Sequence, residues 1–384
     1  MRARSILMYY VLVNDEKKIK KILLLLIVLL VPIGLISNSQ TKIDFKETAK
    51  LGSDWLVQDQ NKDGTFRYKY YLSSGQYSLD DNIVRQMCAA YGLATAYNFF
   101  GDKKYFDASK LSIDHAISIS KTYKLGNKTG RFLPFKGDVK SNAVAVLVLA
   151  IVELSKNNPQ IQSEYSNVLK ELAFYITQSY TEKDVFLDRY DVTSGTYFKK
   201  DDYDYNTGES LLALIELEKI MPDKSNKEII SKASSRLMQI YSDEMKTPFY
   251  GWGAKAYLKL YEENPQTEYR DFIFQMTDKM MQTDYFAQGK TTIVLSVFLE
   301  GLIPVSSFAY DMKDAPRHRL YHNKAINALS RLEKLQIKSK GDLSDEVYSV
   351  VRGAFCSNPL CMTVRVDNNQ HGIMANISAI QFGF

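Results

Sequence analysis

Two kinds of helix-forming segment alternate along the chain from residue 44 to its end. In both kinds apolar residues recur at spacings of three and four, as along one face of an α-helix, and strand-like alternation is scarce. One kind is small and apolar on all sides, as in NAVAVLVLAIVEL from Asn142, which is typical of helices buried on every side. The other kind has one apolar face, as in KYFDASKLSIDHAIS from Lys104. The alternation therefore predicts an all-α protein in which buried helices are covered by amphipathic ones.

The spacing of these segments predicts about six helical hairpins. Tight turns rich in Gly, Asp, Asn and Pro separate several pairs, as at Gly101-Asp102 and Asn264-Pro265. An inner helix, a tight turn, an outer helix and a longer return, repeated about six times, describe a closed double ring, or α/α toroid. Because no Pro/Ser-rich linker or charge run divides the chain, we expect one toroid domain over 40–384. The predicted helices cover residues 44–60, 81–99, 104–121, 138–155, 161–180, 206–220, 225–241, 249–262, 266–282, 291–303, 318–336 and 367–381.

Three stretches resemble a known group of toroid proteins. These are WLVQDQNKDGTFRYKY (Trp55–Tyr70), DNIVRQMCAAYGLATAYNFFGDKKY (Asp81–Tyr105) and NTGESLLALIEL (Asn206–Leu217). The chain resembles the six-hairpin glycosidase-like superfamily, which includes glucuronyl epimerase-type and unsaturated uronyl hydrolase-type domains. The resemblance covers most of residues 44–384 and implies a carbohydrate-active protein. Terpene cyclases, lanthionine cyclases and prenyltransferase subunits share the toroid, so the reaction stays open.

The N-terminal segment, residues 1–39, is predicted to be a signal peptide or signal anchor. Lys17, Lys18, Lys20 and Lys21 precede the apolar run ILLLLIVLLVPIGLI over residues 22–36. This run is short for a membrane-spanning helix, and small residues follow it, which favours a cleaved signal peptide. We expect the rest of the chain to lie outside the cytoplasm, in the periplasm or extracellular space, anchored to the membrane if the segment is not cleaved.

Charge and cysteine content narrow the possible partners. The formal charge of +5 comes largely from residues 1–39, which hold six basic and two acidic residues. No clustered basic face remains, so we expect no nucleic-acid partner. Cys356 and Cys361, with four residues between them, form a plausible disulfide in an exported protein, whereas Cys88 is expected in the core. No cofactor or metal motif is present, and we expect neither.

Polar residues at the starts of the inner helices are the candidate site. Parallel inner helices would direct their N-termini, with unpaired N–H groups and partial positive charge, to one end of the central cavity. Sugar-handling residues are expected there. The candidates for substrate binding are Arg85, Gln86, Tyr205, Tyr250, Trp252, Arg365 and Gln370.

Four residues are the candidates for catalysis. Glu209 begins a buried helix, where a carboxylate is costly unless it is paired or functional, and we interpret it as a general acid or base. Asp367 and His371 lie on one helical face, where the alternative is a capping Asp and a packed His. Asp81 is expected to cap its helix and to pair with Arg85, a structural ion pair being the alternative to a site for an anionic sugar.

These observations leave two functions open. The first is an enzyme of a polysaccharide or uronate-containing glycan, either a hydrolase with two carboxylates or a lyase or epimerase that uses Tyr205 or His371 near an acidic proton. The second is a non-catalytic toroid that binds a glycan or a protein.

Overall fold

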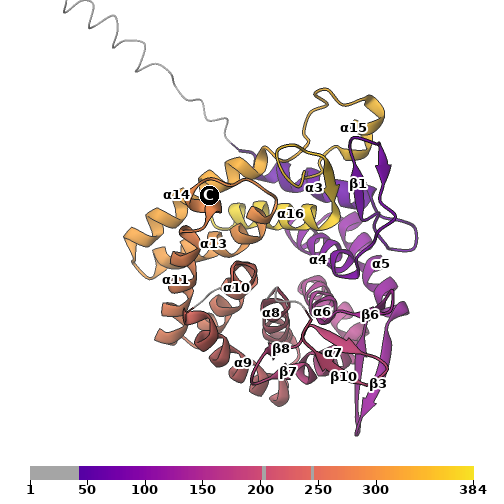
Figure 1. Cartoon of the computed structure of the whole chain (residues 1–384), viewed down its shortest axis with the longest axis vertical. Coiled ribbons are helices and arrows are strands. Elements are labelled where there is room, and N and C mark those ends of the chain that lie inside the picture. The colour runs from indigo at the N-terminus through magenta and orange to yellow at the C-terminus, as the bar shows by residue number, and fades with distance from the viewer. Residues whose placement is uncertain (1–42, 201–204, 244–245) are drawn as a thin grey trace, which may run out of the picture. The chain divides into compact units, whose positions relative to one another are not determined.

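The computed structural model describes residues 43–200, 205–243 and 246–384, and residues 44–384 form one compact unit (Figure 1). The predicted signal segment, residues 1–39, lies outside the described residues.

Six helices of the described chain form a closed inner ring. Each packs against the next, and the last packs back against the first. This arrangement confirms the predicted α/α toroid. In ring order the helices are α4 (Ile83–Phe100), α6 (Ser141–Ser155), α8 (Tyr205–Ile220), α10 (Thr247–Glu263), α13 (Val294–Asp311) and α16 (Val366–Gln381).

An outer helix covers each inner helix, as the alternating sequence pattern predicts. Five of them follow their inner helix after a turn of two or three residues: α5 (Lys103–Ile119), α7 (Pro159–Gln178), α9 (Lys224–Asp243), α11 (Thr267–Met281) and α14 (Ala315–Glu333). The sixth outer helix is α3 (Phe45–Gln58), which packs against α16 from the other end of the chain. The ring is therefore closed by packing between its first and last helices.

Short strands occupy the return segments before several inner helices. The pairs are β3 (Lys121–Leu125) with β4 (Lys128–Phe132), β5 (Pro134–Phe135) with β6 (Asp138–Val139), β7 (Tyr180–Thr181) with β8 (Val185–Phe186), and β9 (Arg189–Asp191) with β10 (Thr196–Phe198). A three-stranded antiparallel sheet has the order β11 (Thr363–Arg365), β1 (Lys69–Tyr71) and β2 (Gln76–Tyr77), with Lys69 opposite Arg365. This sheet joins the returns before α4 and α16, so the two helices start side by side.

Helix α13 continues to Asp311, beyond the predicted end at residue 303. The helix runs through Pro304, although proline lacks the N–H that a helix interior needs. Val305 and Phe308 are buried, and their packing holds the helix through the proline. Among the described residues, α13 is also long and apolar enough to cross a membrane, but 72% of it is buried inside this unit, as in a core helix. The short helices α12 (Asp284–Ala287) and α15 (Asp345–Val351) were not predicted.

Candidate functional site

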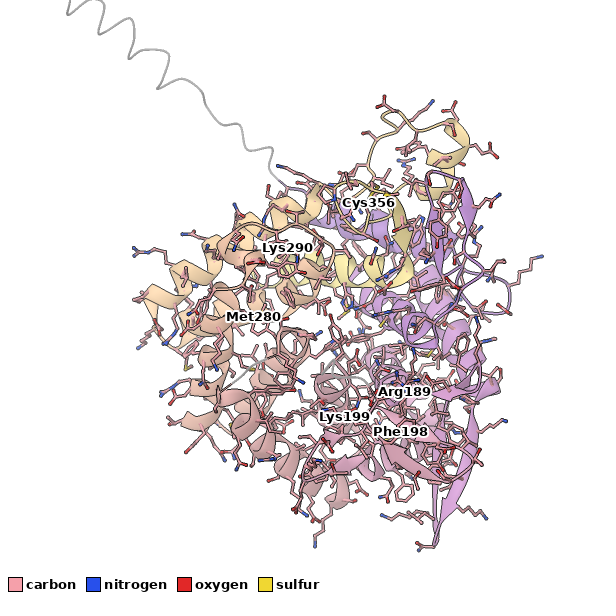
Figure 2. All side chains as sticks on the ribbon, in the orientation of Figure 1. Arg189, Phe198, Lys199, Met280, Lys290 and Cys356 are labelled. Carbon is pink, nitrogen blue, oxygen red and sulfur yellow. A yellow bond between two sulfur atoms is a disulfide. The ribbon has the colours of Figure 1, made fainter. Side chains whose placement is uncertain are left out.

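A pocket of about 280 Å³ opens at the starts of α4, α6 and α8. Its wall combines polar side chains of the three helices with the return before α8, from which Asp188 and Arg189 reach it. Figure 2 labels Arg189, on β9, and Phe198, the residue opposite it on β10. The lining residues are Asn82, Val84, Arg85, Lys140, Asn142, Asp188, Arg189, Tyr205 and Asn206.

An ion cluster joins the starts of α4 and α16. Asp367 is 3% exposed, and its Oδ2 lies 3.3 Å from Nε of Arg85 and 2.8 Å from Nη2 of Arg365. Burial disfavours the charge, but Arg85, Arg365 and His371 together hold the pKa of Asp367 below its usual value. Asp367 in turn is the main cause of the raised pKa of Arg85. Asp367 is therefore an ionised carboxylate with two cationic partners.

Glu209 lies in the first turns of α8 and is 3% exposed. Burial raises the pKa of its carboxyl to about 7, against the opposing effects of Arg85, the Asn142 amide and Lys255. Its Oε2 has no hydrogen-bond partner among the described residues. Because Arg85 and Asn142 both line the pocket, Glu209 lies directly behind the pocket wall.

A second charged group lies further along the inner helices. Oε1 of Glu300, on α13, lies 2.6 Å from Nδ1 of His371, and its Oε2 accepts a 2.6 Å bond from Nζ of Lys255, on α10. Burial opposes the charge of Glu300, yet Lys255 and His371 hold the pKa of Glu300 below its usual value. Nζ of Lys255 lies 4.0 Å from the ring centre of Trp252, which meets His371 edge to face. A carboxylate accepts hydrogen bonds, so Nδ1 of His371 donates, and no described residue bonds to its Nε2.

In ring order α8 and α16 are opposite one another. Glu209 therefore projects from one side of the inner ring, and Asp367 and His371 project from the other. Arg85 connects the two sides, since it pairs with Asp367 and also lowers the pKa of Glu209.

The predicted cap and ion pair of α4 were assigned to the wrong residues. Asn82 caps the helix by accepting a bond from the N–H of Val84, and Arg85 pairs with Asp367 instead of Asp81. Asp81 precedes the cap, where its Oδ1 accepts from Nε2 of Gln86 and from the N–H of Asn82. The sequence could not separate these cases, because Asp and Asn are equally good caps and Asp367 is distant in the chain.

Gln86 holds the loop that covers the start of α4. Its amide oxygen accepts from the N–H of Phe66, and its nitrogen donates to the Phe66 carbonyl and to Asp81. Its hydrogen-bonding groups are therefore engaged by the protein itself.

The remaining candidates occupy different places. Tyr205 lines the pocket, and burial raises the pKa of its hydroxyl. Gln370 packs against Gly92 of α4, and its Oε1 has no hydrogen-bond partner in the described part of the chain. Tyr250 is fully buried between α10 and α11, where its hydroxyl donates to Thr277. Asp367 does not cap α16, since its side chain binds the two arginines.

The sequence reasoning missed Glu300, Lys255 and Asn142. Glu300 stands alone in the apolar run TTIVLSVFLEGL, and the cost of burying a carboxylate there is the same signal that selected Glu209. In the described residues, no group of three His, Cys, Asp or Glu side chains lies together as a metal site.

The chain folds as an α/α toroid of six helical hairpins, and comparison with solved structures shows the same fold. The GH76A α-1,6-mannanase of Salegentibacter sp. matches with a TM-score of 0.63 at 12% identity, covering 88% of this chain and 100% of that chain. Cellobiose 2-epimerase of Bacillus thermoamylovorans has a TM-score of 0.65 at 10% identity, covering 87% and 98%. An unsaturated glucuronyl hydrolase specific for heparin has a TM-score of 0.58 at 9% identity, covering 88% and 98%. No protein-family model and no curated protein sequence matches the chain.

Proposed function

We propose that this protein is an enzyme that acts on a carbohydrate by general acid–base catalysis at the starts of the inner helices. The observation that carries the proposal is Glu209, a buried carboxyl with a pKa of about 7 and an unpartnered oxygen behind the pocket wall. A group that titrates near neutral pH can both donate and accept a proton during a reaction. The similarity in fold to a mannanase, an epimerase and a uronyl hydrolase supports a sugar as the substrate.

His371 supplies a second proton-transfer group. Glu300 fixes its ring through Nδ1, which leaves Nε2 without a partner among the described residues. An imidazole oriented by a buried carboxylate is a common arrangement for a general base. Because Glu209 and His371 come from opposite sides of the ring, they suit the removal of a proton from one face of a sugar carbon and its return to the other.

This arrangement supports an epimerase or lyase best. Arg85 lines the pocket and would neutralise a substrate carboxylate or an enolate that forms beside it. Asp367 and Glu300 are both bound by cations, which makes them weak bases.

Hydrolysis is the second candidate, and one observation favours it. The pKa of Glu209 is raised while that of Asp367 is lowered, and such a split separates an acid from a base. In that reaction Glu209 would protonate the leaving oxygen and Asp367 would activate water.

Proton NMR in D2O with uronate-containing and neutral oligosaccharides distinguishes these reactions. Exchange of a ring proton for deuterium identifies an epimerase, new reducing ends together with a vinylic proton identify a lyase, and new reducing ends without either signal identify a hydrolase. We expect Glu209→Gln to lower turnover by about 10²–10⁴-fold. The control is Glu218→Gln, the same change at a buried glutamate of the same helix, which accepts bonds from the N–H of Asp223. Binding without any reaction would replace this proposal with a non-catalytic glycan-binding toroid.

We also propose that the toroid works outside the cytoplasm. The disulfide between Cys356 and Cys361 supports this location, because such bonds persist in oxidising compartments (Cys356 is labelled in Figure 2). Cell fractionation tests the location, and N-terminal sequencing of the mature protein tells a cleaved signal peptide from an anchor. Recovery of the full-length chain in the cytosol would contradict the proposal.

A further inference from the structure

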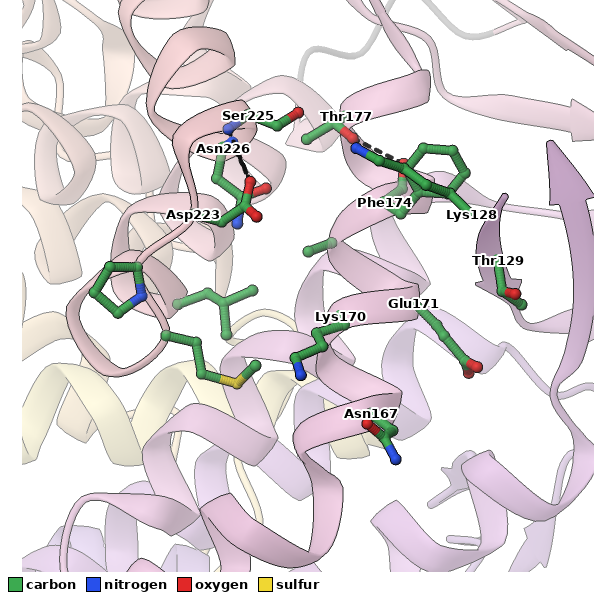
Figure 3. A pocket seen from close by; sticks show the side chains of 14 residues that line it. Lys128, Thr129, Asn167, Lys170, Glu171, Phe174, Thr177, Asp223, Ser225 and Asn226 are labelled. Carbon is green, nitrogen blue, oxygen red and sulfur yellow. Dashed lines mark hydrogen bonds between the residues drawn. The ribbon is translucent and has the colours of Figure 1, made fainter. Parts of the chain in front are cut away.

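A larger pocket of about 660 Å³ lies on the outer wall of the ring (Figure 3). It lies between outer helix α7 and the turn from α8 to α9, with β4 beside it. It runs along α7 from Asn167 to Thr177, which is roughly 15 Å of helix. It shares no lining residue with the pocket at the inner-helix starts.

Apolar and polar surfaces face each other in this outer pocket. The apolar part comes from the side of α7 and from the α8–α9 turn: Ala173, Phe174, Leu217, Met221 and Pro222. The polar part includes Asn167, Ser225 and Asn226 (Figure 3). A sugar presents apolar C–H faces and polar hydroxyl edges, so both surfaces suit the same ligand.

Asn226 gives the pocket a polar side chain that is available to a ligand. The residue is only 6% exposed, and its side-chain amide makes no hydrogen bond with the described protein, although its backbone N–H bonds to Asp223. Its amide atoms are not enclosed by protein but open into the pocket, where water or a ligand can bond to them. Its oxygen and nitrogen can bind a donor and an acceptor together, as neighbouring sugar hydroxyls provide.

The charges around the pocket favour an acidic ligand. Lys128 and Lys170 make no ion pair with described residues, and Lys128 lies 5.5 Å from the ring centre of Phe174. Both acidic lining residues are already engaged. Glu171 accepts a 2.6 Å bond from Arg131, and Asp223 accepts from the N–H groups at the start of α9. The positive charge is therefore the charge available to a ligand.

We propose that this outer pocket binds an acidic oligosaccharide and holds a polymeric glycan while another part of it occupies the inner-ring site. The class of ligand rests on the proposed function, whereas the pocket, the unpartnered Asn226 and the two lysines are independent of it. A uronate chain places its sugar rings on the apolar surface, its hydroxyls at Asn226 and its carboxylates near Lys128 and Lys170.

Calorimetric titration of the intact protein with a tetrasaccharide of galacturonate tests the proposal, with a neutral mannotetraose as the comparison ligand. We expect Asn226→Leu and Lys128→Gln/Lys170→Gln each to weaken one tetragalacturonate site by about tenfold or more, as the loss of charged hydrogen bonds predicts. Asn226→Asp is the conservative variant. An acidic residue suits the first turn of α9, so the helix should be kept, whereas the added negative charge repels a uronate. The charge-matched control is Lys46→Gln/Lys334→Gln, which alters α3 and the end of α14 and should leave binding unchanged.

The outcomes separate this inference from the proposed function. Unchanged binding in all the pocket variants, or equal binding of mannotetraose, overturns the inference even if turnover still depends on Glu209. If binding depends on Asn226 but the protein turns over none of the tested sugars, the outer binding pocket is supported and the proposed enzymatic function is overturned. Where both hold, the pocket variants should lose turnover of polymer while turnover of a short substrate stays at the wild-type rate.

Discussion

The ionisation of Glu209 links the candidate chemistry to the stability of the fold. Its pKa is about 7 in the folded protein, against an ordinary value of 4.5, because the carboxyl is buried. Between these two values the native protein holds a proton that the unfolded chain has released. The free energy of unfolding must therefore fall as the pH rises through this window.

Glu209→Gln should remove this pH dependence. We expect the variant to gain about 3 kcal/mol relative to the wild type between pH 5 and pH 8, measured by urea unfolding. Asp367→Asn is the control, because Asp367 should change the free energy of unfolding with pH in the opposite direction. The pKa of Asp367 is lowered, so its stabilising effect is complete above its ordinary value of 3.8 and is lost only as the pH falls further. A difference between wild type and Glu209→Gln that stays constant from pH 5 to pH 8 would show that Glu209 titrates normally.

The pair formed by Glu300 and Lys255 makes a different prediction about stability. Glu300 is 3% exposed and the side chain of Lys255 is 16% exposed, so removing one partner leaves a mostly buried charge unpaired. We expect Glu300→Gln to cost about 3–5 kcal/mol, and Glu300→Gln/Lys255→Met to recover a large part of that loss. Denaturant unfolding of both variants and of Lys255→Met completes the double-mutant cycle. Additive losses would mean that the two side chains do not interact.

For single residues, the sequence predicted which side chains belong to the site better than it predicted their ion-pair partners. A carboxylate in an apolar helix pointed to Glu209, and the same reasoning would have found Glu300. The contact of Arg85 with Asp367 spans most of the chain. The spacing of neighbouring residues cannot reveal a contact between residues so far apart in sequence, so the prediction paired Arg85 with the nearby Asp81.

Glycines set how closely the inner helices approach. A Cβ on Gly251 of α10 would lie 2.4 Å from the backbone oxygen of Val297 of α13, closer than atoms tolerate. In an open helix, Gly→Ala stabilises by up to about 1 kcal/mol through helix propensity. Here we expect Gly251→Ala to destabilise by about 1–3 kcal/mol, because α10 and α13 must separate. Thermal unfolding tells the two effects apart, because close packing predicts a lower midpoint and helix propensity predicts a higher one. A stabilised variant would show that the helices are not in tight contact.

The elements themselves were largely predictable, because helical periodicity extends over many residues in every ring helix. The predicted helix at 138–155 contains the observed helix Ser141–Ser155, and the predicted helix at 206–220 nearly equals Tyr205–Ile220. Prediction failed where tertiary packing overrides local preference, as at Pro304 of α13. It also failed for the short strands of the returns, which have too few residues to show a period.

The closure of the whole ring depends on α3 and α16, which come from opposite ends of the domain. The end of α3 and the start of α16 lie together, since the N–H of Arg67 bonds to the carbonyl of Asp59 and the N–H of Val366 bonds to the carbonyl of Tyr68. The two helices are therefore antiparallel, like the helices of the other five hairpins. Trp55 of α3 also donates through Nε1 to the carbonyl of Val350 on α15, which precedes α16 in the chain.

This geometry predicts that the sixth hairpin can be made continuous. A circular permutant that joins Phe384 to Asp44 through a short Gly/Ser linker, with new ends between Gly126 and Asn127 in the β3–β4 turn, should fold into the same ring. The cut falls in an exposed turn, where new ends are tolerated, and the new join repeats the inner-to-outer turn found five times already. We expect one cooperative thermal transition and Glu209-dependent turnover like that of the parent. Deletion of residues 44–60 is the matching disruption, because it removes α3 and exposes the buried face of α16. If the deleted protein melts like the parent, α3 is not needed to close the ring; if the permutant fails to fold while the parent folds, closure requires the native chain order.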